Sequence, residues 1–312
     1  MPFEIDYLAL SPELVVVATM LGVFALDLIL PRARKFWIAT VAVAGTAIAA
    51  VPLVILAADG TVRSMFDGSY VVDEFAVILK GLFIVSAYIV LLMSHHYIES
   101  ERYYQGEYYF LLLASVLGSL VMASSRDLII LFIGLELTTG PLYLLAGWRK
   151  GDAKSNEASM KYFILGVLST AIMLYGMSLL FGLTGEVTFA GLAQATSGLA
   201  DEPIMVVALF GLIVGFGFKI AAVPFHFWAP DTYEGAPTPV TAYLSVNSKA
   251  AGFVAFLLIM YQALPDISEV WAPALWILAV LSMTVGNLAA LRQTNIVRLL
   301  AYSSIAQAGF ML

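Results

Sequence analysis

Apolar residues in this chain occur in runs of about 20, the length that crosses a bilayer as a helix. These runs are too long for strands. Within a bilayer a helix satisfies its own backbone hydrogen bonds. The pattern therefore predicts an all-α, polytopic transmembrane helix bundle. We expect spans at 9–30, 36–58, 73–95, 106–123, 128–148, 159–183, 203–228, 237–262, 271–292 and from 296 to the end.

The connections between these spans differ in charge on the two sides of the membrane. With the N-terminus outside, the outer connections hold only Arg63 and Arg126 as basic residues, and acidic residues gather there. The inner connections hold most of the basic residues, namely Arg32, Arg34, Lys35, Arg102, Arg149, Lys150, Lys154, Lys161, Arg292 and Arg298. Because lysine and arginine favour the cytoplasmic side, we expect a multi-pass protein with its N-terminus outside.

Composition agrees with a membrane protein and excludes several other classes. The 312 residues are 61% hydrophobic and 12% charged, with a mean hydropathy of +0.93, which leaves too little charge to cover a soluble surface. The sequence has no cysteine, so it cannot itself form disulfides or hold cysteine-ligated zinc or iron–sulfur clusters. The net charge of −7 argues against a nucleic-acid partner.

Charged residues inside the spans are the first candidates for function, because a charge at mid-bilayer costs at least a few kcal/mol. Glu136 lies about eight residues from the outer end of its span, roughly 12 Å deep at the helical rise per residue. We interpret it as a proton carrier or as a charge that tunes a neighbouring lysine. A structural ion pair between helices is the alternative.

Lys219 lies in the stretch GFGFKIAAVPFHFWAPDTYEGAPTP. Pro224 cannot donate to the carbonyl of Ile220, so the helix is weakened beside the lysine. Helices broken near the midplane commonly form ion sites, because freed backbone groups hold water or charge. We favour a functional lysine over a kinked helix with a satisfied lysine.

Lys249 lies near the middle of the next span, after Ser245, Asn247 and Ser248. This stretch is too polar to face lipid, so we expect it to face the protein interior. Desolvation disfavours the ammonium form of a buried lysine, and a nearby carboxylate restores it. If the electrostatic effect of that carboxylate on Lys249 changes, Lys249 would therefore take up or release a proton.

Three further residues are candidates of a weaker kind. His226 follows Lys219 by about two helical turns if the helix persists, and it is either a proton relay or a hydrogen-bonded structural residue. Glu157 and Lys161 have i,i+4 spacing and share a helix face. They form either an inner proton entrance or an exposed surface pair.

Two other charges inside spans have structural explanations. Lys80 lies within about two turns of the outer edge, so we expect its side chain to extend to the membrane surface. Asp27 lies near the cytoplasmic end of its span, close to Arg32.

These residues together resemble the antiporter-like subunits of energy-converting membrane complexes. Within that family, the chain is most similar to the subunit N group of bacterial NADH:quinone oxidoreductase, respiratory complex I, whose mitochondrial counterpart is the ND-type subunit 2. The resemblance covers nearly the whole chain from about residue 100 onward. It rests on GEYYFLLLASVLGSLVMASSRDLIILFIGLELTTGPLYLLAGW, NEASMKYFILG, FGFKIAAVPFHFWAPDTYEGAPTPVTAYLSVNSKAAGF and LRQTNIVRLLAYSSIAQAGFML.

The resemblance implies a fold of about fourteen helices with two inverted five-helix repeats, each with a broken helix. We expect N-terminal helices in 1–105, the first repeat in 106–262 and an incomplete second repeat in 263–312, as in a C-terminally truncated chain of about ten helices. Glu136 and Lys219 would form a coupled pair, and Lys249 would be the central lysine. Lys161 with Glu157, and His226, match other polar positions on the family's proton route.

The resemblance also implies the surroundings of the chain. It would lie in a bacterial inner membrane beside other membrane subunits, including paralogous antiporter-like ones. The chain itself would bind no cofactor, whereas the complex would use NADH, FMN, iron–sulfur clusters and quinone. Gln307 stands where related subunits often have histidine, which favours the subunit N group.

Other functions are open at this stage. The homologous subunit of a multisubunit Na⁺/H⁺ antiporter or of a membrane-bound hydrogenase is a close alternative. A structural scaffold with buried ion pairs and a stand-alone secondary carrier are more distant ones. Lysines inside adjacent spans argue against the scaffold.

Overall fold

Helices form almost all of the regular structure in the computed structural model, which describes residues 5–31, 34–100 and 106–312. Arg32 and Arg102, which contributed to the expected orientation, lie outside the described residues. The helices are α1 (Ser11–Ile29), α2 (Phe36–Asp59), α3 (Glu74–Ser100), α4 (Gly106–Ser124), α5 (Leu128–Ala146), α6 (Ala153–Thr184), α7 (Phe189–Ala195), α8 (Pro203–Ile220), α9 (Trp228–Gly235), α10 (Thr238–Tyr243), α11 (Lys249–Leu258), α12 (Ser268–Leu291) and α13 (Ile296–Met311).

Nine helices in the described part of the chain are long and apolar enough to cross a membrane. They lie at the first nine predicted spans, which confirms a multi-pass membrane protein. The eighth span, Thr238–Ala263, is one helical segment. In it the π-helical turns η2 (Leu244–Ser248) and η3 (Ile259–Ala263) flank α11. The last predicted span corresponds to α13, which has 16 residues.

A two-stranded sheet lies between α2 and α3, where the hydrophobic pattern indicates only a connection. Strand β1 (Arg63–Met65) pairs antiparallel with β2 (Tyr70–Val72), with Arg63 opposite Val72. Strands of three residues are too short to show the alternation that identifies a strand. Arg63 holds this hairpin to α2 through Asp59, with a nitrogen–oxygen distance of 2.8 Å.

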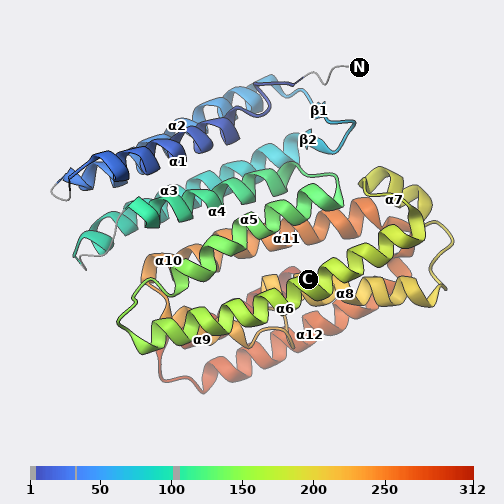
Figure 1. The fold of residues 1–312 in the computed structure, drawn as a ribbon. Helices are drawn as coiled ribbons and strands as arrows, with labels where there is room; N and C mark the ends of the chain where they lie inside the picture. The colour runs from blue at the N-terminus through green and yellow to red at the C-terminus, as the bar shows by residue number, and fades with distance from the viewer. Residues whose placement is uncertain (1–4, 32–33, 101–105) are drawn as a thin grey trace. The chain divides into compact units, whose positions relative to one another are not determined.

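The chain divides into two compact units, each drawn from separate stretches of sequence. Unit 1 comprises Met1–Arg126, Ile130–Leu145 and Pro237–Ala251, and unit 2 comprises Asp127–Ile129, Ala146–Ala236 and Gly252–Leu312. In unit 1, helices α1 to α4 lie side by side (Figure 1). In unit 2, α6 packs against α8 and α9, and α12 packs against α13. The domain boundaries expected near residues 105 and 262 stay predictions.

Small residues set the closest helix contacts in both units. A side chain at Gly118 of α4 would meet the backbone nitrogen of Thr138 in α5 at 2.4 Å. In unit 2, a side chain at Gly176 of α6 would meet the carbonyl oxygen of Ala208 in α8 at 2.7 Å. Helices in membranes associate largely by such close backbone packing, because lipid offers no hydrophobic driving force.

Lys80 does not extend to the membrane surface, so that expectation is wrong. Its side chain is fully buried, and Nζ lies 2.7 Å from Oε1 of Glu13 in α1. The Tyr70 hydroxyl of β2 donates to the same oxygen at 2.8 Å and lies 3.1 Å from Lys80 Nζ. This buried cluster connects α1, β2 and α3, so an ion pair between distant segments replaces the expected exposure.

Removing one member of this cluster should destabilise unit 1. We expect Lys80→Met to lower the free energy of unfolding by about 3–5 kcal/mol, because Glu13 is left charged and buried. The double variant Glu13→Gln/Lys80→Met should lose much less. Equilibrium unfolding in detergent micelles measures both. Losses that simply add would contradict this account.

Candidate functional site

The helix that carries Lys219 is broken, as the sequence predicts. Helix α8 ends at Ile220, and α9 begins at Trp228. The segment 221–227 between them, here called the break, includes Pro224, which has no amide proton to continue the helix. Seven non-helical residues therefore separate α8 from α9.

The end of α8 has the hydrogen bonds of a Schellman motif. Ala222 N donates to Gly217 O at 2.8 Å, and Ala221 N donates to Phe218 O at 3.0 Å. Ala221 has a φ of 58°, in the left-handed region where glycine is usual. These bonds satisfy carbonyls that the missing helical turn leaves without partners.

Lys219 lies in the last turn of α8 and is 4% exposed. The partial negative charge of a helix C-terminus favours a cation at this position. A side chain added at Gly252 would meet Lys219 Cγ at 2.7 Å. Gly252 therefore leaves room for the lysine stem within unit 2.

Aromatic side chains hold the two sides of the break together. Trp228 Nε1 donates to the Phe218 carbonyl at 2.9 Å, which connects α9 to the end of α8. The ring of Tyr162 from α6 stacks on Trp228 with centroids 4.6 Å apart. The break is thus a packed structure rather than a loose loop.

His226 lies in the break itself, so the helix does not persist from Lys219 to His226, and the two residues are not two helical turns apart. The helix ends one residue after Lys219, because Ala221 takes the left-handed conformation. His226 is buried, and its ring lies 4.5 Å from that of Phe227 and 6.4 Å from that of Tyr302, between centroids. Its role as a proton relay stays a prediction.

Lys249 is buried next to a polar group in unit 1, as the sequence predicts. It directly follows the π-helical turn η2, a type of distortion frequent at functional sites. The Asn247 carbonyl oxygen accepts from Ser119 Oγ at 2.9 Å, and its amide donates to Ser86 Oγ at 3.1 Å. Asn247 and Ser248 are buried, whereas Ser245 is half-buried.

Glu136 lies in α5 and is half-buried within unit 1. Unit 1 therefore contains Glu136 and Lys249, and unit 2 contains Lys219, His226, Glu157 and Lys161. The pairing of Glu136 with Lys219 stays a prediction.

Glu157 and Lys161 form the predicted pair, with Lys161 Nζ 2.6 Å from Glu157 Oε1. The pair is not isolated, because the same nitrogen lies 2.6 Å from Asp231 Oδ2 in α9. Lys161 thereby connects α6 to the half-helix that follows the break.

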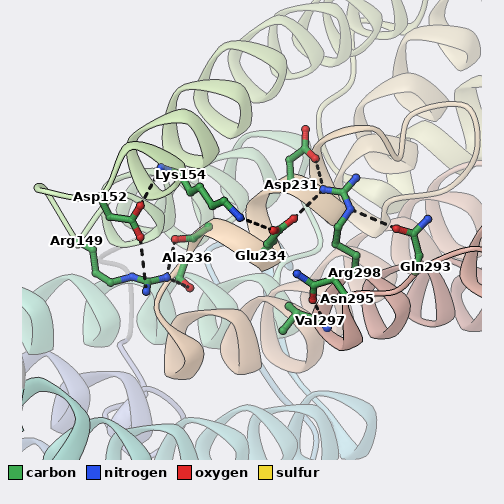
Figure 2. Close-up of polar contacts among 11 residues, drawn as sticks. Arg149, Asp152, Lys154, Asp231, Glu234, Ala236, Gln293, Asn295, Val297 and Arg298 are labelled. Carbon is green, nitrogen blue, oxygen red and sulfur yellow. Dashed lines mark hydrogen bonds and ion pairs between the residues drawn. The ribbon is translucent and has the colours of Figure 1, made fainter.

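A larger network surrounds α9 (Figure 2). Arg298 of α13 lies 2.6 Å from Asp231 and 3.1 Å from Glu234, and Lys154 of α6 lies 2.9 Å from Glu234. We call the set the α9 ion-pair network. Its members are Lys154, Glu157, Lys161, Asp231, Glu234 and Arg298. Three cations and three carboxylates balance one another.

A polar cavity of about 260 Å³ lies at this network. Its walls are formed by Lys154, Glu157, Ala158, Asp231, Glu234, Gly235 and Arg298. A polar cavity of this size holds several waters. The network is therefore in contact with a space that water can occupy.

Sequence reasoning missed Asp231, Glu234 and Arg298. Asp231 and Glu234 have i,i+3 spacing, which places both carboxylates on one face of α9. That spacing was an available signal. The sequence indicates Arg298 only as a basic residue of an inner connection. Its ion pairs are not predicted, because its partners lie far away in the sequence.

The carboxylates of α9 ionise more readily than usual. Hydrogen bonds from Lys154 and Arg298 hold the pKa of Glu234 below its ordinary value. Burial raises the pKa of Asp231, but hydrogen bonds from Lys161 and Arg298 outweigh burial, so this pKa is lowered as well. Both groups are therefore charged at neutral pH.

The network should weaken in acid. Because both pKa values are lower in the folded state, the stabilisation is complete above the ordinary carboxyl range near pH ~4 and is lost as pH falls through the lowered values. We expect the amides of 228–236 to lose protection there, with each exchange rate taken relative to that of an unprotected amide at the same pH, and Asp231→Asn to remove part of this pH dependence. The exposed Asp201, changed to Asn, is the control. Protection in 228–236 that does not change as the pH falls would contradict the assignment.

Comparison with known proteins places the chain among energy-converting membrane subunits. The family described as "NADH:quinone oxidoreductase/Mrp antiporter, TM" matches residues 125–312. The chain is 46% identical to NADH-quinone oxidoreductase subunit N of Moorella thermoacetica over 97% of its length. It covers 63% of that relative. The chain thus spans about three fifths of the length of the curated relatives it matches.

Two solved structures share the fold. A chain of respiratory complex I from Thermus thermophilus is 36% identical, with a TM-score of 0.80 over 96% of this chain and 62% of that one. A chain of the membrane-bound sulfane sulfur reductase, an archaeal respiratory membrane complex, is 27% identical, with a TM-score of 0.87 over 97% and 63%. These similarities confirm the antiporter-like fold that the sequence predicts.

Proposed function

The chain belongs to the NADH:quinone oxidoreductase/Mrp antiporter transmembrane family, and from this premise we propose that it is a proton-translocating membrane subunit of respiratory complex I. The complex would oxidise NADH and reduce quinone, and this subunit would use the released energy to move protons. The higher sequence identity to complex I than to the sulfane sulfur reductase supports this choice.

One observation carries the proposal: a buried lysine at the end of a broken helix inside a membrane protein. A lysine at this position costs free energy, so a function that needs its charge or its proton explains why it is there. Lys219 has its stem buried against Gly252 and lies in the last turn of α8. Small changes at the break would change the stability of its charged form.

We assign the other residues according to their surroundings. Glu157 and Lys161, in the α9 ion-pair network beside the polar cavity, would pass protons inward from the cytoplasm. His226 in the break would relay them. Glu136 would set the protonation of Lys219, and Lys249 would be the next proton carrier.

The surroundings of the chain follow from the same proposal. It would lie in a bacterial inner membrane with its N-terminus outside. Its partners would be other membrane subunits, including paralogous antiporter-like ones. It would bind no cofactor, and NADH, FMN, iron–sulfur clusters and quinone would be held elsewhere in the complex.

A Na⁺/H⁺ antiporter or membrane-bound hydrogenase subunit is the second candidate, since the matching family is described by the Mrp antiporter as well as by NADH:quinone oxidoreductase. Purification of the intact complex separates the two. A complex I subunit should copurify with NADH-oxidising subunits. Copurification with cation-antiporter subunits and no NADH-oxidising arm would overturn our choice.

Substitution of the buried charges tests the mechanism. In membrane vesicles with the assembled complex, Lys219→Ala and Glu136→Ala should abolish or strongly reduce the protons moved per NADH oxidised, because protonatable groups inside the bilayer are lost. Lys150→Ala, which removes an exposed lysine from a connection, is the matched control. Normal proton transport in both variants would remove this mechanism.

A further inference from the structure

Several contacts within unit 2 connect α12 and α13 to the break and to α9. The first is Ser282 of α12, which is fully buried. Its hydroxyl accepts a hydrogen bond from Val223 N at 2.9 Å. A buried amide without a partner is costly, so Ser282 provides the acceptor that a continuous helix would have provided.

The second contact comes from α13. The ring of Tyr302 meets that of His226 edge-on, with centroids 6.4 Å apart and an interplanar angle of 60°. Tyr302 follows Arg298 by four residues, so both side chains lie on the same face of α13. One face of α13 is therefore directed at the break and at α9 together.

The third contact is the guanidinium of Arg298. Its Nη1 donates to Asp231 Oδ1 at 2.6 Å and to Glu234 Oε2 at 3.1 Å. Among the described ion pairs of α9, Arg298 is the member that bonds both carboxylates, whereas Lys161 and Lys154 each bond one. Arg298 thus joins two separate ion pairs into one network.

Helix α9 depends on such contacts for its position. It has only eight residues, and an isolated helix of that length is not stable in water. Its place is set by α6, which supplies Lys154 and Lys161, and by α13, which supplies Arg298. Without Arg298, Asp231 would keep only its ion pair with Lys161, and Glu234 would keep only its ion pair with Lys154.

We infer that Arg298 is a positioning residue for proton transport. It holds α9 against α13, so that a displacement of α13 reaches His226 and the end of α8 where Lys219 lies. The inference rests on the proposed function, because the position of the break matters only if these residues carry protons. The competing explanation is that the α6 lysines alone hold α9 and that Arg298 is a dispensable ion pair.

Three variants in the assembled complex separate these explanations. Arg298→Ala removes the bridging charge, and Arg298→Lys keeps the charge without the planar guanidinium. Arg292→Ala removes an exposed arginine from the end of α12, six positions upstream, and serves as the matched control. Protons moved per NADH and amide hydrogen exchange in 221–236 are measured on the same membrane preparations.

We expect Arg298→Ala to lose most of its proton transport and to exchange faster in 221–236. The acid-induced loss of protection in that segment should begin at a higher pH, because Asp231 and Glu234 have lost a cation that favours their charged forms. Arg298→Lys should recover part of both properties. Arg292→Ala should match the unchanged protein.

The outcomes distinguish this inference from the proposed function. If Arg298→Ala transports protons normally while Lys219→Ala does not, the positioning role is wrong and the proposed function stands. If neither variant loses transport, the proposed function fails too. Lost transport with unchanged exchange in 221–236 also overturns the positioning role. Arg298→Gln replaces Arg298→Ala if the alanine variant does not assemble, with the same criteria.

Discussion

The cost of a charge inside an apolar layer is the constraint on which the rest of this structure depends. The buried lysines in the described part of the chain lie at particular places in the fold. Lys80 is neutralised by Glu13, with a tyrosine hydroxyl beside both. Lys219 lies at the negative end of a helix that stops one residue later. Lys249 follows a π-helical turn, next to a hydrogen-bonded asparagine. The first arrangement is an ion pair between two helices, whereas Lys219 and Lys249 both lie where a helix is irregular.

The same constraint explains why α9 carries so many charges. Helix α9 has only eight residues and is too short to be stable through its own hydrogen bonds. It therefore needs contacts with other helices. The α9 ion-pair network, together with the stacking of Tyr162 on Trp228, supplies that support. The non-helical backbone after Lys219 is therefore held in place by contacts from α6 and α13. In this way the stability of the fold and the setting of the candidate proton site are connected.

Much of the fold could be predicted from the sequence, because spans and the break follow from local rules. Apolar runs predict the nine helices of the described residues that are long and apolar enough to cross a membrane, and Pro224 near Lys219 predicts the break. The features that the sequence does not predict depend mainly on tertiary contacts. The partner of Lys80 lies in another helix, so its depth alone suggested exposure. Arg298 contacts α9 only after the chain has folded, and no periodicity within its own helix shows this. The span expected at 203–228 corresponds to α8, which ends at Ile220, so His226 lies outside the helix.

The most direct test of the central claim is the proton-to-NADH ratio of Lys219→Arg in vesicles that contain the assembled complex. Arginine keeps a positive charge in the last turn of α8 but does not release its proton in proteins. If Lys219 carries protons, the variant assembles and loses proton transport despite the preserved charge. If Lys219→Arg moves as many protons per NADH as the unchanged protein, only the charge matters and the proton-carrier account is contradicted.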